Sequence, residues 1–394
     1  MHIGLSWRRR PQPLGARFAT FAVATGLILS ACGSTSSSSG SHTATGASAT
    51  TGGAPAAASS CASQAASLVA AQRAEMKPII PQPAFDMGKN RGKSVYYISI
   101  SQETGYALAL SQGFTAAAKA AGMKPFIFDA MDKPELFVQG VEQAIAAHAG
   151  GIFLVSIPTS LIQAQLKQAR AAGIPVLTLN YRGPSEPLQY TNGIFEVPVT
   201  RIGRNLAQYA AYATQCKTKS LVVSDPSIPG FVVQVNATHT ELARLCPQCK
   251  ATDVPISLAT MATAAAPTVE SALQRNPSTN AVLAMFDGLA TYLQPSISAS
   301  SSKALLISTD GNAQNLDAVR KGTQASDLAY APTNYQGYLV IDQLGRAMLG
   351  LKTNPPAIQL QLFDHTNIPS GSSFTALWPG LVGFEQAFAK AWGL

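Results

Sequence analysis

The sequence has few charged residues and lacks the short motifs of the common enzyme classes. Only 12% of its 394 residues are Asp, Glu, Lys or Arg, against about 25% in typical soluble domains. It has no HExxH zinc motif, no P-loop, no GxSxG nucleophile motif and no GxGxxG before a helix. The five His residues are dispersed, and His148, at a predicted helix end, suits a structural role. We therefore expect neither an enzyme nor a metal or cofactor requirement.

Positive charge is only slightly in excess once the N-terminal segment is set aside. The formal net charge is +8, but Arg8, Arg9, Arg10 and Arg17 lie in a segment without Asp or Glu. Without these four arginines, 24 basic and 20 acidic residues remain, a net charge of +4. The remaining Lys and Arg residues form no basic stripe, so we expect no nucleic-acid partner.

The N-terminal 32 residues have the pattern of an export signal. The basic run Arg8–Arg10 precedes the apolar run Phe18–Leu29, whose 12 residues are too few for a bilayer, which takes about 20. The run ends in Leu29-Ser30-Ala31-Cys32-Gly33, which resembles the lipobox of bacterial lipoproteins. That resemblance implies lipid on Cys32, which becomes the new N-terminus; the alternative is an ordinary secretory signal with a chance Cys.

A flexible linker is expected to follow, over residues 33–60. All of these residues except His42 are Ser, Thr, Gly, Ala or Pro, a composition that cannot bury enough apolar surface to order itself. As a coil it would span about 30 Å. The natural role is a tether between a lipidated Cys32 and a folded body. The alternative, a linker between two cytosolic domains, does not explain the leader.

The remaining residues predict two α/β lobes. About 330 residues suit two domains of about 100–200 residues each, and short apolar runs alternate with helical patterns from Ser94 onward. Asp132 is expected to cap a helix beginning at Pro134. Such alternation predicts two doubly wound parallel sheets. The expected strands are Val95–Ile100, Pro125–Phe128, Gly151–Val155, Ile174–Leu179, Ser220–Val223, Ala251–Val254, Ala281–Met285, Ala304–Ile307 and Leu328–Ala331.

Polar and aromatic residues follow many of these strands. Because ligands of open α/β sheets bind beyond the carboxyl ends of the strands, we expect these residues to line a cleft. Taken singly, each of these residues is better explained as a helix N-cap or a solvated loop residue; their recurrence at so many strand ends favours the cleft. They are Gln102, Glu103 and Tyr106; Asn180, Tyr181 and Arg182; Phe286 and Asp287; Asp310 and Asn312; and Tyr330, Asn334 and Tyr335.

The body resembles the ribose/galactose type of periplasmic binding proteins (type 1), whose fold the lactose-repressor family shares. The resemblance covers about residues 94–392. It rests on Tyr97-Ile98-Ser99-Ile100-Ser101, Gln112-Gly113-Phe114, Ala171-Ala172-Gly173-Ile174-Pro175-Val176, Phe286-Asp287-Gly288, Thr309-Asp310-Gly311, Leu316-Asp317-Ala318-Val319-Arg320-Lys321-Gly322, Gly337-Tyr338 and Leu349-Gly350.

This resemblance implies three crossover segments between the lobes, near Val197–Pro198, Ala331–Pro332 and His365–Asn367. The N-terminal lobe would comprise residues 61–197 and 332–365, and the C-terminal lobe residues 198–331 and 366–394. Where the family often has a ligand-gripping Arg, this chain offers Gln234 and Asn236, and Phe286 replaces an Asn. These departures do not favour ribose and leave open a related sugar, a polyol, a cyclitol or another small polar metabolite.

The function implied is that of a monomeric, lipid-anchored extracytoplasmic receptor, in a periplasm or on the outer cell surface. It would deliver its ligand to the permease and ATPase subunits of an ABC importer. One alternative is a sensory receptor of the same fold that signals to a membrane kinase or chemoreceptor. Another is an extracytoplasmic enzyme with Asp287 and Asp310 as paired glycosidase carboxylates. A sugar-binding cleft needs carboxylates too, because they accept strong hydrogen bonds from hydroxyls, so binding is preferred.

Four cysteines remain after Cys32, and an even number in an exported protein favours disulfides. Three pairings of Cys61, Cys216, Cys246 and Cys249 are possible. Cys246-Pro247-Gln248-Cys249 is the best local candidate for a bridge, with Cys61 and Cys216 either paired or free. A redox role for this CxxC is disfavoured because Cys246 follows a helix, where the negative helix end does not lower a thiol pKa.

Overall fold

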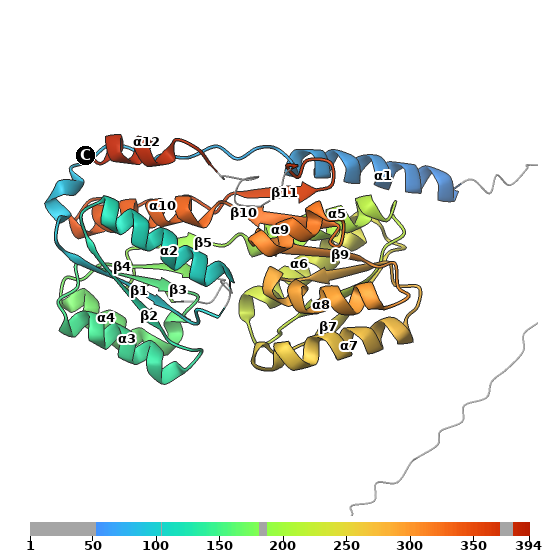
Figure 1. Cartoon of the computed structure of the whole chain (residues 1–394), viewed down its shortest axis with the longest axis horizontal. Coiled ribbons are helices and arrows are strands. Elements are labelled where there is room, and N and C mark those ends of the chain that lie inside the picture. Colours follow the sequence, from blue (N-terminus) through green and yellow to red (C-terminus); the bar gives the residue numbers. More distant parts are fainter. Residues whose placement is uncertain (1–52, 104, 181–186, 371–380) are drawn as a thin grey trace, which may run out of the picture. The chain divides into compact units, whose positions relative to one another are not determined.

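The computed structural model describes residues 53–103, 105–180, 187–370 and 381–394. Residues from Gly52 onward form one compact unit, which contains two α/β lobes, each built on a mostly parallel sheet (Figure 1). The expected fold class is therefore confirmed. The leader, Cys32 and residues 33–52 lie outside the described residues.

The first lobe is a five-stranded parallel sheet in the order β2-β1-β3-β4-β5. Helices cover both faces, with α2 and α10 on one side and α3 and α4 on the other (Figure 1). This explains why β1 and β3 are apolar and buried almost throughout. The elements are β1 (Ser94–Ser99), α2 (Gly105–Ala120), β2 (Lys124–Asp129), α3 (Pro134–Ala146), β3 (Gly151–Val155), η2 (Thr159–Ile162), α4 (Gln163–Ala171), β4 (Val176–Asn180), β5 (Gly193–Glu196) and α10 (Thr333–Met348).

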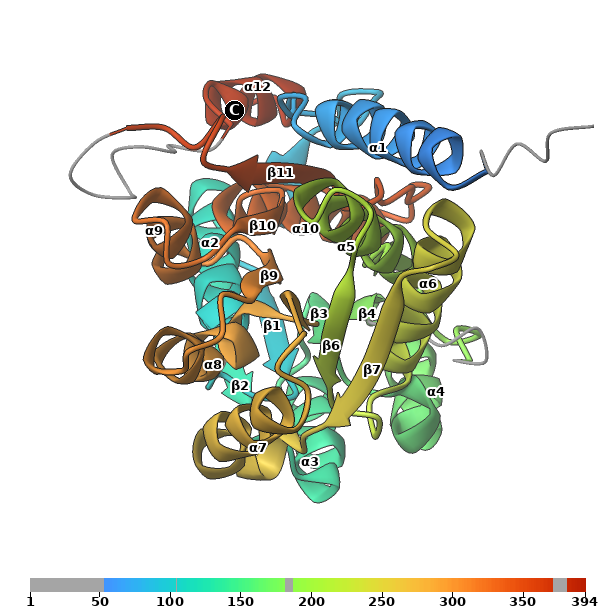
Figure 2. The ribbon, with the colours of Figure 1, turned by 90° about the vertical axis from the view of Figure 1, so that its right-hand side faces the viewer.

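The second lobe is a six-stranded sheet in the order β11-β10-β9-β8-β6-β7, in which only the edge strand β11 runs antiparallel to its neighbour. Figure 2 shows α5 and α6 on one side of this sheet and α7 and α8 on the other. The elements are α5 (Val199–Ala213), β6 (Lys219–Ser224), α6 (Pro229–Leu245), β7 (Lys250–Pro255), η3 (Leu258–Thr260), α7 (Met261–Arg275), β8 (Ala281–Ala284), α8 (Asp287–Ala299), β9 (Leu305–Asp310), α9 (Ala313–Arg320), β10 (Ser326–Tyr330) and β11 (Leu360–Asp364).

Two glycines let α2 and α10 approach closely in the first lobe. A Cβ on Gly113 would lie 2.3 Å from the backbone oxygen of Thr333, and one on Gly337 would lie 2.2 Å from the backbone of Gly113. Real Cβ atoms do not come so near, so only glycine permits this packing. The glycines of the two sequence motifs Gln112-Gly113-Phe114 and Gly337-Tyr338 therefore lie at one contact between α2 and α10.

The first helix departs from the expected linker. α1 (Gly53–Gln72) begins within the expected linker, so that its first eight residues, 53–60, belong to a helix. Cys61, Ala65, Val69 and Gln72 recur at helical spacing and are buried, and α1 packs on α5. Alanine has the highest helix propensity, so an alanine-rich run favours a helix. Packing one face of α1 on α5 buries apolar surface that the small side chains of this segment could not bury by themselves.

The expected division into lobes also needs correction at its ends. Residues 61–72 lie in α1 and pack on the second lobe rather than the first. β11, expected in the first lobe, pairs with β10, because the hydrogen-bonding groups along that edge of β10 need a partner. α12 (Phe384–Ala391), expected in the second lobe, packs instead on α10 of the first.

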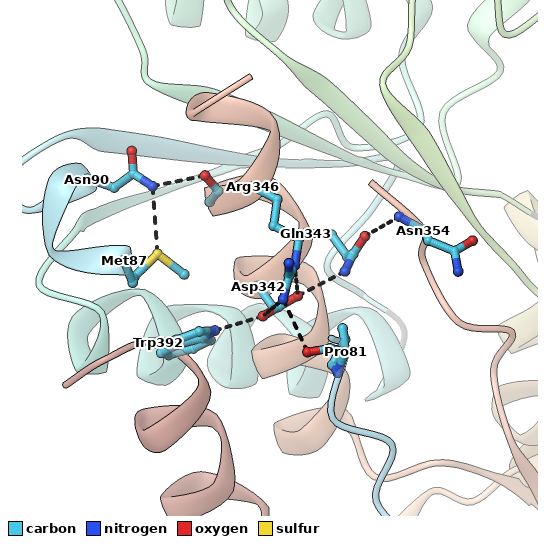
Figure 3. A network of polar contacts seen from close by, with 9 residues as sticks. Pro81, Met87, Asn90, Asp342, Gln343, Arg346, Asn354 and Trp392 are labelled. Carbon is cyan, nitrogen blue, oxygen red and sulfur yellow. Dashed lines mark hydrogen bonds and ion pairs between the residues drawn. The ribbon is translucent and has the colours of Figure 1, made fainter. Parts of the chain in front are cut away.

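A buried polar network fixes the C-terminus to the first lobe (Figure 3). Within α10, Arg346 forms a buried ion pair with Asp342, with 2.8 Å between Nε and Oδ2. The Trp392 indole donates to Asp342 Oδ1 at 2.9 Å, and Arg346 donates to the carbonyl of Pro81 at 3.1 Å. The segment before β1, which includes η1 (Met87–Asn90), is thereby held between α10 and the end of α12.

The described part of the chain contains two disulfides. Cys246 bonds Cys249, as predicted, and Cys61 bonds Cys216, one of the two outcomes left open. The second bridge joins α1 to the turn after α5 across 155 residues of sequence. Among the described residues, no helix combines the length and apolar character needed to cross a membrane.

Candidate functional site

A pocket of about 360 Å³ lies where the carboxyl ends of the strands of both sheets meet. Ile100, Asp132 and Ser156 follow β1, β2 and β3. Opposite them, residues that follow or end β6, β7, β8 and β9 contribute the second wall, so each lobe supplies half of the lining. The lining residues are Ile100, Tyr106, Ala107, Asp132, Pro134, Phe137, Val155, Ser156, Pro158 and Leu161 of the first lobe, and Asp225, Ser227, Ile228, Pro229, Phe231, Ser257, Leu258, Ala259, Phe286 and Asp310 of the second.

Aromatic rings form part of both walls. In the second lobe the rings of Phe231 and Phe286 stack at 5.2 Å with an interplanar angle of 3°. Tyr106 of the first lobe meets Tyr330 of the second edge to face at 5.5 Å, and its hydroxyl donates to Gln336 Oε1 at 2.7 Å. The Phe pair offers a flat apolar surface of the kind on which the C–H face of a ring can stack.

Each lobe contributes a carboxylate to the pocket lining, Asp132 from the first and Asp225 from the second. Asp225 accepts hydrogen bonds from the Ser227 amide and hydroxyl at 2.8 and 2.6 Å and from the Leu258 amide at 2.7 Å. Burial raises the pKa of Asp225, but these bonds outweigh it and the pKa is lowered. Asp132 is exposed, and burial of its partly covered carboxyl together with the charge of Asp225 raises its pKa.

The backbone around these carboxylates is unusual on the first-lobe side. Met131 and Asp132 have φ of 48° and 55°, a left-handed conformation that few non-glycine residues adopt and that Asp tolerates better than most. Asp132 was expected to cap α3. Instead Lys133 occupies the N-cap, and Asp132 lines the pocket.

Three further carboxyl groups are buried in the second lobe, and one of them, Asp310, belongs to the pocket lining. Asp287 accepts hydrogen bonds from the Ser308 hydroxyl at 2.5 Å and from the Asn312 amide at 2.7 Å. Burial raises the pKa of Asp287 to about 7. Burial and the neighbouring charge of Asp287 raise the pKa values of Asp310 and Asp327 well above the usual range. At neutral pH these buried groups therefore hold protons between them.

Asp310 connects this cluster to the pocket. Its Oδ2 accepts a hydrogen bond from the Asp287 amide at 3.2 Å, whereas its Oδ1 accepts none of normal geometry from a described residue. The residue is 8% exposed and lines the pocket. Its φ of 143° lies in a region that favours glycine, and strain of this kind is typical of functional positions. Asp310 thus adds a buried carboxyl group to the pocket lining, and the Tyr330 side chain beside it partly offsets the effect of burial on its pKa.

The predicted site residues divide into three groups. Tyr106, Phe286 and Asp310 line the pocket. A second group lies behind the lining and supports it: Gln102, Gln234, Asp287 and Tyr330. For example, the Gln234 amide donates a hydrogen bond to the Met285 carbonyl at 3.0 Å, and the Gln102 amide donates one to the Ser99 hydroxyl at 2.7 Å. Asn180 ends β4, and its side chain, with Tyr181 and Arg182, lies outside the described residues.

Several lining residues were missed, and a sequence signal existed for some of them. Asp225 lies two residues after the predicted strand Ser220–Val223, and Asp225-Pro226-Ser227 is a typical turn in which Asp accepts a hydrogen bond from the backbone amide two residues on. The strand-exit argument that found Asp310 would also have found Asp225. Phe137 and Phe231 lie on helices, where apolar spacing alone does not separate a core residue from a lining residue.

Comparisons with known proteins agree with this architecture. A family model described as "Periplasmic binding protein domain" matches residues 95–352. Among curated proteins, none matches the chain at a significant level.

Within the described ranges, no group of three or more His, Cys, Asp and Glu residues is arranged to hold a metal ion.

Solved structures with the same fold include three from different bacteria. An ABC sugar transporter subunit from Rhodobacter sphaeroides is 18% identical, with a TM-score of 0.63 over 71% of this chain and 100% of its own. An ABC transporter solute-binding protein from Agrobacterium vitis with bound allitol is 18% identical, with a TM-score of 0.62 over 70% and 96%. A carbohydrate transporter from Acidothermus cellulolyticus in complex with myo-inositol is 18% identical, with a TM-score of 0.61 over 76% and 99%. At this identity the likeness establishes the fold.

Proposed function

We propose that this chain, which belongs to the periplasmic binding protein domain family, is an extracytoplasmic solute-binding lipoprotein. It captures a small polar ligand, a sugar or sugar-like compound, and delivers it to the permease and ATPase subunits of an ABC importer. The observation that carries this proposal is the pocket of about 360 Å³ whose lining comes in equal parts from the carboxyl ends of two sheets. The allitol and myo-inositol held by structural neighbours support a ligand of this class.

The pocket suits capture by closure of the two lobes. A ligand that contacts both walls binds the closed state more tightly than the open state. The difference between these two binding free energies shifts the equilibrium toward the closed state. The Phe231–Phe286 stack offers an apolar face for a ring. The carboxyl group of Asp310 and the hydroxyls of Ser156 and Ser257 belong to residues that line the pocket, and they offer directional partners for polar groups. No step of this cycle alters a covalent bond of the ligand.

The decisive experiment identifies the ligand and watches closure. Protein purified without denaturation is unfolded, and the released compound is identified by mass spectrometry. The compound is then added back to ligand-free protein, with affinity measured by calorimetry and compaction by small-angle scattering. We expect a small polyhydroxylated compound, recovered chemically unchanged, that binds and makes the protein more compact. Conversion of the compound by the protein, or binding without compaction, would overturn the proposal.

A further inference from the structure

The N-terminal segment connects the two lobes in addition to the three expected crossover segments. α1 packs on α5 of the second lobe, and Cys61 fixes it there through the bond to Cys216. The short helix η1, in contrast, packs on α10 of the first lobe. Residues 73–86, here called the strap, therefore run from one lobe to the other, and Figure 1 shows this stretch leaving α1 and passing α12.

Polar contacts hold the first residue of the strap on the second lobe. Arg73 forms an ion pair with Asp364, the last residue of β11, with 2.5 Å between Nη2 and Oδ2. The Asp364 side chain is fully buried and that of Arg73 is 20% exposed, so water and salt screen this pair less than a surface pair. The Arg73 guanidinium also lies 5.3 Å from the centre of the Tyr212 ring on α5. This end of the strap therefore moves with the second lobe.

Contacts with α10 hold the other half of the strap on the first lobe. The Tyr335 hydroxyl accepts a hydrogen bond from the Ile79 amide at 2.7 Å and donates one to the Ile79 carbonyl at 2.9 Å. Arg346 donates to the Pro81 carbonyl at 3.1 Å, and its guanidinium lies 4.4 Å from the centre of the Phe85 ring. This half of the strap therefore moves with the first lobe.

The strap has no spare length between the two sets of contacts. On the second-lobe side, the Lys77 carbonyl accepts a hydrogen bond at 3.0 Å from the Gln359 amide, one residue before β11. Ile79 is already bound to Tyr335 of the first lobe, so Pro78 alone separates the two sets. Proline fixes φ and leaves only ψ free to rotate. A change in the angle between the lobes must therefore be taken up at Pro78 or break a contact on either side of it.

We propose that the strap is a fourth connection between the lobes, which confines the ligand-free protein to a narrow range of interlobe angles around the arrangement in which both lobes line the pocket. The apparent affinity of a binding protein falls with the fraction of ligand-free molecules in the binding arrangement. Confining the lobes near that arrangement therefore raises the affinity for the ligand. The inference goes beyond the proposed function, because it concerns the molecule before the ligand binds.

Extra residues after Pro78 would loosen the strap and leave the side chains that hold its ends in place. Gly-Ser-Gly-Ser inserted there supplies slack, because such a sequence behaves as a flexible coil. The same insertion after Ser301 is the matched control. Ser301 is exposed in the loop between α8 and β9, within the second lobe, so that insertion leaves the connection between the lobes unchanged.

Tyr335→Phe is a second and smaller change. It removes both hydrogen bonds to Ile79 and keeps the ring, which packs edge to face on Phe384 at 5.5 Å. Tyr209→Phe is its matched control, because the Tyr209 hydroxyl donates to the Ala325 carbonyl at 2.9 Å and both residues belong to the second lobe. This pair separates the loss of a strap contact from the loss of a tyrosine hydroxyl in general, and it keeps the test decisive should the insertion impair folding.

The test measures the distance between the lobes in ligand-free protein. Nitroxide labels are attached to non-natural residues in place of Lys167 on α4 and Glu270 on α7, both exposed, and pulsed electron paramagnetic resonance gives the distribution of distances between them. We expect a narrow distribution in wild type and in both controls, and a broader one in the Pro78 insertion and in Tyr335→Phe. The affinity of these two strap variants for the co-purifying compound should fall severalfold, whereas the controls should keep wild-type affinity.

The outcomes separate this inference from the proposed function. Distributions of equal width in wild type and both strap variants overturn the inference, and so does unchanged affinity in both variants. Because the labels report on protein without ligand, that result leaves the proposed binding function standing. If no compound co-purifies, the proposed function fails, and the distance distributions still decide whether the strap restrains the lobes.

Discussion

Asp310 is the single residue on which ligand affinity is expected to depend most. It lines the pocket, and its buried Oδ1 has no hydrogen bond of normal geometry from a described residue. Replacing it with Ala or Asn should weaken binding of the co-purifying ligand by about fivefold to a hundredfold, because a polar group left without its partner in a buried site costs about 1–3 kcal/mol. Calorimetry measures the affinity, and the Asn variant keeps the side-chain shape should the Ala variant fold poorly.

Asp317→Ala is the control for Asp310. Asp317 lies on α9, where it forms ion pairs with Arg320 and Lys321, and it does not line the pocket. Its replacement should leave affinity unchanged. Equal affinity in wild type and both Asp310 variants would remove Asp310 from the site.

The buried carboxyl groups of Asp287, Asp310 and Asp327 should also shape the dependence of stability on pH. Burial raises their pKa values above those of the unfolded chain, for Asp287 to about 7. Between about pH 4 and 7 the unfolded chain has released these protons while the folded chain retains them. Stability should therefore fall as pH rises through this window, by up to about 1.4 kcal/mol per pH unit for each retained proton.

Asp327→Asn tests this expectation, because an amide cannot ionise. The free energy of unfolding, measured with urea at several pH values from about 4.5 to 7, should fall less steeply with pH in the variant than in wild type. Asp317→Asn removes a carboxylate whose pKa is lowered by Lys321 and Arg320, so it should not reproduce the effect. Parallel curves for wild type and Asp327→Asn would mean that Asp327 releases its proton in the folded chain as readily as in the unfolded one.

Among the elements, α1 depends most on a covalent link. The Cys61–Cys216 bridge closes a loop across 155 residues, whereas Cys246–Cys249 spans three. Because a disulfide restricts the unfolded chain more when its loop is longer, removing the first should cost up to about 5 kcal/mol and removing the second about 2 kcal/mol. Equilibrium unfolding of Cys61→Ser/Cys216→Ser and of Cys246→Ser/Cys249→Ser compares the two. An equal loss, or a larger loss for the short loop, would contradict this account.

At the scale of the whole molecule, we expect lipid on Cys32 to hold the protein at the membrane. Lipid on Cys32 would add about 0.8 kcal/mol per buried methylene, and stable attachment takes more than one chain. Cys32→Ala should therefore move the protein from the membrane to the soluble fraction, as measured by fractionation and by the mass of the N-terminal peptide. Ser36→Ala, outside the lipobox-like motif, should leave the protein on the membrane. Wild-type protein that is soluble and carries no lipid mass would refute the anchor.

Much of the fold could be predicted from the sequence, because each strand and helix carries its own local pattern. Gly151–Val155 is apolar throughout and forms β3 with those bounds, since a central strand of a covered parallel sheet is buried on both faces. The CxxC bridge was predictable for the same reason: its two cysteines are neighbours in the chain. The strand-exit rule likewise placed Tyr106, Phe286 and Asp310 at the pocket.

What the sequence left open are relations between elements that are distant in the chain. The partner of Cys61, the pairing of β11 with β10 and the docking of α12 on α10 each depend on which surfaces meet after folding. Local periodicity reports that a face is buried but not against what, so α1 was taken for a flexible linker over its first eight residues. The sharing of one pocket by Asp132 and Asp225 is of this kind too: the two residues are separated by most of a lobe in sequence, and only the tertiary structure places both in the same lining.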